Sequence, residues 1–438
     1  MDFLKHIAFS QSLEHIGLLH LAINIVYALF VPYVSVLFVS MIIAVTFERR
    51  GLKSGNEMSV RFARELTQSV IPNKSSLLLF GVLPFFAVLL GYAQLLQDSP
   101  DVAVSTLFVS FLLFSAGALC LYAYAYTFRL NEILSIATSA GPDEALDQYA
   151  KENIRFHANA GMWGVVLVTL SQFLFELAVS ASTKPWEVTT LWDALISPES
   201  YARMGQALSF AGMLTGAAIL YLFFAGKHTE ESEYTQFVKK FSITLSLLST
   251  LAAPLFILLI LAAFPQNGLT GSVFGITALV LIMLFAAGHF FYAMLKSFST
   301  RLAANALFIL TAALILAVIK DQIAFGSATR IESARLAARY DKENQALLDK
   351  MGLGAAPLTG EEIFTGRCSA CHTFTEKKVG PPYKETLPKY ENKRDELVAF
   401  ILNPKKMNPA FPPMPNQGLK PAEADSIAAY IMKTYKQK

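Results

Sequence analysis

Eight long apolar stretches, separated by short polar segments, occupy most of the first 320 positions of the chain. Each is long enough to form a helix across a bilayer, which takes about 20 residues. The pattern predicts spans at about 16–46, 75–97, 103–129, 155–181, 203–226, 237–264, 270–297 and 302–320. The first is overlong for one crossing, so we expect part of it to tilt or to extend beyond the bilayer. The predicted fold over residues 1–320 is an all-α polytopic membrane bundle of about eight spans.

The remainder of the chain is polar. Residues 321–357 are Ala-rich with a helical pattern from about Ser327 to Lys350, which predicts a stalk. Residues 358–438 then predict a small α-helical domain. Overall, 54% of residues are hydrophobic and 16% are charged, against about 25% charged in an average soluble protein. This composition excludes a disordered chain and an ordinary soluble enzyme. The net charge of +3 and the lack of a basic stripe argue against a nucleic-acid partner.

Lysine and arginine are unevenly divided between alternate loops. The loops that follow the first, third, fifth and seventh predicted spans form one set, which holds 14 positive residues: Arg49, Arg50, Lys53, Arg61, Arg64, Lys74, Arg129, Lys151, Arg155, Lys227, Lys239, Lys240, Lys296 and Arg301. The loops on the opposite side, together with the N-terminal segment, hold three: Lys5, Lys184 and Arg203. Cytoplasmic loops carry an excess of positive residues, so the first set is predicted to be cytoplasmic. Eight spans then place both termini on the outer side of the membrane.

The polar tail contains Cys368-Ser369-Ala370-Cys371-His372, the attachment sequence of a c-type haem. Two thiols one helical turn apart add to the two vinyl groups of one porphyrin, and the adjacent His372 is held under the iron as an axial ligand. A zinc site would need two more ligands nearby, and a redox-active thiol pair would not need His372. The third cysteine, Cys120, lies in an apolar run and is predicted to be a small core residue.

A second iron ligand is expected further along the chain. Met414 lies in Phe411-Pro412-Pro413-Met414-Pro415, where the prolines stiffen the loop around the thioether. Met407, in a Lys-rich stretch, is the alternative. Methionine ligation raises the potential of a haem, so we expect a haem c that accepts electrons readily.

Residues from about 358 to 438 resemble a class I monohaem cytochrome c domain. The likeness rests on the attachment sequence, on Gly360–Phe364 as the first helix, on Val379-Gly380-Pro381-Pro382 and on the last helix after the Met414 loop. It implies an all-α fold around haem, a Pro381 carbonyl that accepts the N–H of His372, and a role in electron transfer. It also implies attachment on the outer, periplasmic side of a bacterial cytoplasmic membrane, in agreement with the loop charges.

Eight spans exceed what an anchor needs, and ionisable residues inside a membrane are costly and usually functional. The candidates are His15, His20, His157, His289 and Glu176. Measured from the cytoplasmic ends of their spans at 1.5 Å per residue, the predicted depths of His157 and His289 in the membrane differ by about 7 Å. This difference allows the two histidines to share a b haem. The alternatives are an interfacial histidine and a hydrogen bond between helices. His20, near the outer end of the first span, is a candidate ligand of a second b haem. Glu176 is a candidate proton acceptor for quinol, or else a hydrogen-bonding group between helices.

The segment 153–161 (Asn-Ile-Arg-Phe-His-Ala-Asn-Ala-Gly) and Leu29-Phe30-Val31-Pro32 resemble parts of the large subunit of cytochrome bd quinol oxidases. The likeness implies that His157 is a haem b ligand in a quinone-type membrane domain. The third span carries no carboxylate, unlike that family, which places oxygen reduction last among the hypotheses.

Three hypotheses for function follow. The first is a membrane-bound electron-transfer subunit, in which electrons pass between quinol, one or two b haems and haem c. The second is a haem-free membrane scaffold that anchors a cytochrome c in a larger respiratory complex. The third is a bd-type oxidase subunit. The expected partners are membrane lipid, other respiratory-complex subunits and a periplasmic electron carrier or donor.

Overall fold

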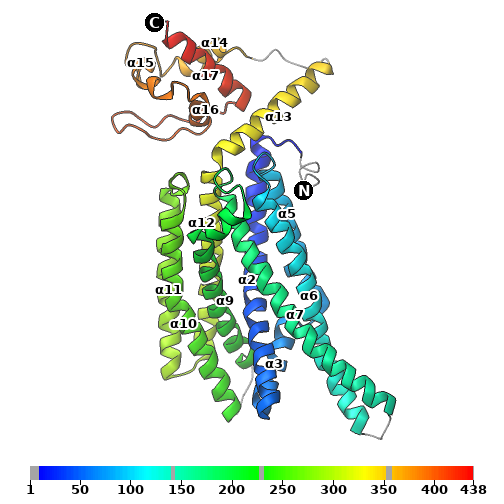
Figure 1. Cartoon of the computed structure of the whole chain (residues 1–438). Helices are drawn as coiled ribbons and strands as arrows, with labels where there is room; N and C mark the ends of the chain where they lie inside the picture. The colour runs from blue at the N-terminus through cyan, green and yellow to red at the C-terminus, as the bar shows by residue number, and fades with distance from the viewer. Residues whose placement is uncertain (1–8, 140–143, 226–230, 352–357, 438) are drawn as a thin grey trace. The chain divides into compact units, whose positions relative to one another are not determined.

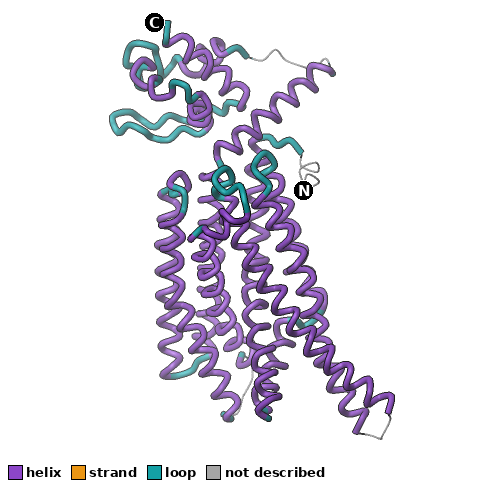
Figure 2. Tube along the Cα trace, in the orientation of Figure 1, coloured by secondary structure: helices purple, strands orange, loops and turns teal. Residues whose placement is uncertain are grey.

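The computed structural model describes residues 9–139, 144–225, 231–351 and 358–437, and every regular element in these ranges is helical (Figures 1 and 2). Two charges of the orientation argument, Lys5 and Lys227, lie outside the described residues. The contacts between residues divide the chain into two compact units. The membrane unit contains His20–Leu96 and Pro100–Ala328. Of the described residues, the C-terminal unit contains 329–351 and 358–437 together with 9–19 and Gln97–Ser99.

Within the described residues, eight helices are long and apolar enough to cross a membrane, which confirms the predicted fold class. The helices of this region are α2 (Leu13–Ser54), α3 (Glu57–Val70), α4 (Lys74–Leu77), the π-helical η1 (Leu78–Val82), α5 (Leu83–Leu95), α6 (Val102–Ser139), α7 (Glu144–Ser182), α8 (Leu191–Ile196), α9 (Pro198–Phe224), α10 (Glu233–Ala263), η2 (Gln266–Gly268), α11 (Gly271–Lys296) and α12 (Thr300–Ala328). The eight spans are α2, α4 with η1 and α5, α6, α7, α9, α10, α11 and α12.

Three of these helices are far longer than a bilayer requires. The helices α2, α6 and α7 have 42, 38 and 39 residues. At 1.5 Å per residue each is about 60 Å long, twice the roughly 30 Å of a hydrocarbon core. The expectation that the first span extends beyond the membrane or tilts therefore applies to three helices.

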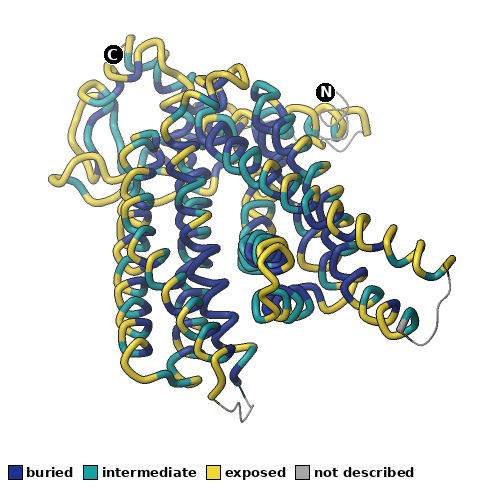
Figure 3. The backbone as a smooth tube through the Cα atoms, turned by 60° about the horizontal axis from the view of Figure 1, so that its bottom comes forward, coloured by how far each residue is buried: buried dark blue, intermediate teal, exposed yellow. Residues whose placement is uncertain are grey.

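Side-chain burial follows the helix faces of the membrane unit (Figure 3). Leu310, Leu284 and Phe291 are buried between helices, whereas Phe285, Leu251 and Phe308 are between 67% and 81% exposed. Exposed apolar side chains in such number are unusual on a soluble surface. Their presence on the outward faces is consistent with contact with lipid.

The helix α9 is packed closely against its neighbours because small residues line it. A Cβ atom at Gly212 would collide with Ser249, and one at Gly216 with Ser246 and the carbonyl oxygen of Ser242. All three serines belong to α10. The Gly212-x-x-x-Gly216 spacing thus brings two helices together, as small residues commonly do in membranes.

The last membrane helix extends further than the sequence predicted. The predicted span stops at 320, but α12 continues to Ala328. Residues 321–328, assigned to the stalk by the sequence, are therefore the end of α12. The rest of that stretch forms α13 (Arg330–Lys350).

The C-terminal unit is a small helical domain. Its other elements are α14 (Gly360–Ile363), the π-helical η3 (Phe364–Cys368), α15 (Tyr383–Thr386), η4 (Pro388–Tyr390), α16 (Arg394–Leu402) and α17 (Pro421–Tyr435). The helix α14 crosses α17 at Gly360, where a Cβ atom would collide with the Ser426 carbonyl and the Tyr430 side chain. The guanidinium of Arg330 donates to the carbonyl oxygens of Ala399 and Asn403, so α13 is packed into this unit.

Candidate functional site

The segment Cys368–His372 forms a helical turn directly after the π-helical turn η3, whose hydrogen bond spans five residues. The N–H of Ser369 donates to the carbonyl of Phe364, five residues back, at 2.8 Å. The N–H of His372 then donates to the carbonyl of Cys368 at 2.9 Å. Wide turns of this kind are frequent at functional sites. Together they bring the two thiols and His372 to the same turn, with Cys368 buried.

The loop after His372 folds back and fixes the imidazole. The N–H of Gly380 donates to the carbonyl of Cys371 at 2.8 Å, and the N–H of Tyr383 donates to that of Thr373 at 3.0 Å. Nδ1 of His372 lies 3.0 Å from the carbonyl oxygen of Pro381. Because a carbonyl only accepts, Nδ1 carries the proton and donates. This leaves Nε2 as the ring nitrogen free to bind a metal.

Gly380 and Tyr383 lie against the imidazole ring of His372. A Cβ atom at position 380 would collide with three ring atoms of His372, so only glycine allows this approach. Tyr383 stacks on the imidazole with ring centroids 5.1 Å apart and an interplanar angle of 9°. Burial, together with the nearby thiols of Cys368 and Cys371, raises the pKa of Tyr383 well above its usual value. Tyr383 is therefore a neutral, apolar wall beside the imidazole.

A pocket of about 1430 Å³ opens next to this turn. Cys368, His372 and Met414 all line it. Its walls are mostly apolar: Tyr383, Leu387, Leu397, Phe400, Ile401, Leu419, Ile427 and Ile431. A flat, largely apolar group attached to the thiols would be enclosed there.

The two candidate methionines differ in position. Both line the large pocket, but only Met414 also lines an adjoining pocket that contains Cys371 and Gly380. Met407 is 64% exposed, whereas Met414 is partly buried. The geometry therefore favours Met414 as the side chain that faces His372.

The C-terminal domain is similar in sequence to known proteins. A family profile described as "Cytochrome C oxidase, cbb3-type, subunit III" matches residues 355–431. Cytochrome c-551 of Pseudomonas denitrificans is 38% identical over 79 residues, and cytochrome c-551 of Azotobacter vinelandii is 36% identical over 78; each alignment covers 17% of this chain and 95% of the relative. Cytochrome c-552 of Hydrogenobacter thermophilus is 31% identical over 90 residues, 20% of this chain and 92% of the relative.

The C-terminal domain of this chain belongs to the cytochrome c family. Its site residues fit a covalently bound haem c: two thiols for the vinyl groups, an imidazole whose Nδ1 is already engaged, a thioether across an apolar pocket, and a glycine where any side chain would strike the ligand. The cytochrome c domain implies electron transfer, and the length and composition of the eight apolar helices indicate a multi-pass membrane protein.

The ionisable residues of the membrane unit lie at separate places. His157 on α7 is buried, and both ring nitrogens are engaged: Nε2 with a carboxylate oxygen of Glu48 at 2.7 Å, and Nδ1 with the Thr127 hydroxyl at 2.7 Å. Tyr124 stacks on it at 4.4 Å and donates to Glu48 at 2.7 Å. In this arrangement neither nitrogen of His157 is free to ligate a haem b.

The other histidines do not join His157. His289 is an exposed residue of α11, whereas the contacts of His157 come from α2 and α6. The structure therefore does not bring these two imidazoles to one site. His20 packs against Phe325 of α12, with ring centroids 5.7 Å apart. His15, in the C-terminal unit, is exposed and lies 5.9 Å from the Tyr340 ring.

Glu176 lies within a group of charged residues that the sequence analysis did not assemble. Its carboxylate accepts from Gln172 at 2.8 Å, and it lines a pocket with Arg203 and Asp321. Arg203 and Glu199 are 3% and 0% exposed, and Lys320 is 2% exposed. The available signal was the i, i+4 spacing of Glu199 and Arg203 at the start of a predicted span, and the charges Lys320-Asp321 at the end of another.

Proposed function

We propose that this protein is a membrane-bound electron-transfer cytochrome, in which the membrane unit oxidises a quinol and the cytochrome c domain receives the electrons. The observation that carries the proposal is the pocket that joins Cys368, His372 and Met414 in a domain of the cytochrome c family. Cys368, Cys371, His372 and Met414 would hold haem c there, and the haem would supply one-electron redox chemistry. The residues around it hold the ligands in place and exclude water.

The protein matrix sets how the iron is held. The Pro381 carbonyl fixes the orientation and proton position of His372, and such hydrogen bonds raise the basicity of a ligating imidazole. The prolines beside Met414 limit the motion of the thioether. A site that is already arranged in this way changes little between its two oxidation states, which favours rapid electron transfer.

A single helix would anchor such a domain, so the other seven spans need a further role. Oxidation of a quinol releases two electrons and two protons. A single haem c would accept one electron at a time, so one quinol would reduce it in two successive one-electron transfers, with an external electron carrier oxidising the haem between them. We propose Glu176 as the first proton acceptor, because its carboxylate lies in a pocket within the bundle. The distribution of loop charges supports a periplasmic cytochrome c domain in a bacterial cytoplasmic membrane.

The test has two parts. A pyridine haemochromogen spectrum of the purified full-length protein gives the ratio of haem b to haem c. Anaerobic addition of a short-chain quinol then shows whether haem c is reduced. Reduction at a rate that saturates with quinol supports the proposal. A fully oxidised haem c after prolonged incubation, with a chemical reductant still effective, contradicts it.

A scaffold role is the second candidate, and one observation favours it. His157 has both ring nitrogens engaged and His289 is exposed, so neither histidine is arranged for haem b. In that case the bundle would dock the cytochrome into a larger respiratory complex, with a periplasmic carrier as the electron donor or acceptor. A spectrum with haem c alone, together with no quinol-dependent reduction, would support the scaffold. Oxygen consumption with quinol would instead support a bd-type oxidase subunit.

A further inference from the structure

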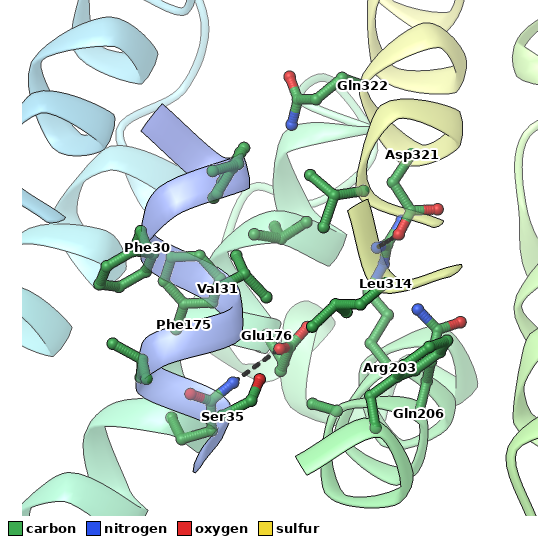
Figure 4. Close-up of a pocket in the computed structure, with 17 residues that line it drawn as sticks. Phe30, Val31, Ser35, Phe175, Glu176, Arg203, Gln206, Leu314, Asp321 and Gln322 are labelled. Carbon is green, nitrogen blue, oxygen red and sulfur yellow. Dashed lines mark hydrogen bonds and ion pairs between the residues drawn. The ribbon is translucent and has the colours of Figure 1, made fainter. Parts of the chain in front are cut away.

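A pocket of about 680 Å³ lies inside the membrane unit between α2, α7, α9 and α12 (Figure 4). Phe30, Val31, Phe175, Phe210, Leu314 and Val318 supply apolar walls, and Gln172, Glu176, Arg203, Gln206, Asp321 and Gln322 supply polar ones. Charged side chains deep in a membrane bundle are costly unless they are paired or bind something. The question is therefore which polar atoms remain unpaired.

Arg203 is held rigidly with one donor group left over. Its Nε donates to Glu199 at 2.9 Å and its Nη1 to Asp321 at 3.4 Å. Nη2 is buried and has no hydrogen-bond partner among the described residues. Both acids are themselves paired, Glu199 with Lys184 at 3.4 Å and Asp321 with Lys320 at 2.6 Å. The guanidinium is thus fixed by two ion pairs and presents a free N–H group beside the pocket.

Unpaired acceptors accompany this donor. Oε1 of Gln206 and Oε1 of Gln322 are buried and lack partners within the described parts of the chain. Gln206 lies one turn after Arg203 on α9, and Gln322 follows Asp321 on α12. Glu176 uses one carboxylate oxygen to accept from Gln172. Buried polar atoms normally find a partner, so this set indicates a ligand that both donates and accepts hydrogen bonds.

The mixture of groups limits the class of ligand. A bound anion would need donors alone, and a metal ion would need acceptors without a neighbouring guanidinium. A lipid tail would need neither. A quinol ring carries hydroxyl groups that donate and accept, and its apolar ring suits a wall that contains Phe30, Phe175 and Phe210. We infer that this pocket binds the ring of a quinol, with Arg203 donating to a ring oxygen and Gln206 accepting from a ring hydroxyl.

This inference rests on the proposed function and assigns the quinol-binding site to this pocket. The test measures binding of decylubiquinol and of a short-chain menaquinol to the delipidated full-length protein by anaerobic isothermal titration calorimetry, with haem c reduced beforehand so that the probes stay in the quinol form. The variants are Gln206→Leu, which removes the acceptor at similar volume, and Arg203→Lys, which keeps the charge but loses the free N–H. Thr250→Val is the matched control, because Thr250 is a buried polar residue of the bundle that does not line the pocket.

We expect at least one of the two probes to bind the wild-type protein. Gln206→Leu and Arg203→Lys should each weaken binding by about tenfold, the effect of one lost hydrogen bond. Thr250→Val should change the affinity by less than about twofold. If Arg203→Lys does not fold, as judged by circular dichroism, Gln206→Leu alone decides the result.

Two adverse outcomes can be told apart. If quinol reduces haem c but the affinities of all variants equal that of the wild type, the pocket assignment is wrong and the proposed function stands. If neither probe binds the wild type and quinol does not reduce haem c, both the site and the proposed function are wrong.

Discussion

The contact between Gly380 and His372 gives a quantitative test of the haem site. In a Gly380→Ala variant, the new Cβ would lie 2.7 Å from Nδ1 and 2.9 Å from Nε2 of His372, against about 3.5–4.0 Å for a favourable contact. The imidazole must therefore move by roughly 1 Å. Its Nδ1 would then lie about 4 Å from the Pro381 oxygen, too far for a hydrogen bond.

The cost has two parts. Overpacking of a close contact costs about 1–3 kcal/mol, and the lost hydrogen bond about 1 kcal/mol. We expect the free energy of unfolding of the cytochrome c domain to fall by about 2–4 kcal/mol. Urea unfolding of the full-length protein in detergent, followed through the haem absorbance and the near-infrared sulfur–iron band, measures this change. The slope against urea should stay the same.

Gly366→Ala is the matched control. Gly366 lies two residues before Cys368, and nothing lies within 4 Å of a Cβ built there. Because alanine is favoured over glycine in a helix by about 0.5–1 kcal/mol, this variant should be as stable as the wild type or slightly more so. Equal stability of Gly380→Ala and Gly366→Ala would refute the argument that position 380 must be glycine to seat His372.

Three further variants test other parts of the C-terminal unit. Met414→Ala should abolish the near-infrared sulfur–iron band and lower the haem potential in a redox titration, because a thioether ligand is lost, whereas Met407→Ala should change neither. Gly360→Ala should reduce the stability of the domain in urea by about 1–3 kcal/mol, since a Cβ there collides with α17; unchanged stability would show that the helix crossing is loose. Burial raises the pKa of Asp341, so the folded state binds its proton more tightly and its contribution to stability falls as pH rises through the folded pKa. Asp341→Asn should therefore be more stable than the wild type at pH 8 and equal to it below the ordinary aspartate pKa of about 3.9, as measured by thermal unfolding at each pH.

The local chemistry of the haem site could be predicted because it is encoded in contiguous residues. The spacing of Cys368, Cys371 and His372 lies within one turn, and the motif identified it without any tertiary information. The hydrogen bond from His372 to Pro381 was expected only through the family resemblance. The structure supplies the reason: the loop between them is pinned by the Gly380 and Tyr383 amides.

The charged pocket of the membrane unit could not be predicted in the same way. Hydropathy averages over neighbours along the chain, so Arg203 was counted as a loop charge and Asp321 was assigned to the stalk. In the structure, α9 begins at Pro198 and α12 continues to Ala328, which places both residues inside helices. Arg203 and Asp321 can be buried because they pair with each other, although α9 and α12 are far apart in the sequence. The order of residues along the chain holds no information about that pairing.

The buried pair of Glu48 and His157 offers a last test, because it separates a packing role for His157 from haem b ligation. In the observed geometry, Glu48 accepts from Tyr124 and contacts His157, so removal of either member leaves a buried polar group without its partner. Removal of one partner of a buried pair costs about 3–5 kcal/mol. Residues in direct contact show coupling of about 0.5–3 kcal/mol, so a double His157→Ala/Glu48→Ala variant should be less destabilised than the sum of the single variants.

Thermal unfolding in detergent, followed by circular dichroism, measures the coupling, and a haemochromogen spectrum of each variant measures haem b. A coupled pair with the haem content unchanged in all three variants would assign His157 to packing between α2, α6 and α7. Loss of haem b absorbance in His157→Ala but not in Glu48→Ala would mean that the imidazole leaves Glu48 to bind iron. The observed hydrogen bonds would then belong to the haem-free arrangement of the bundle.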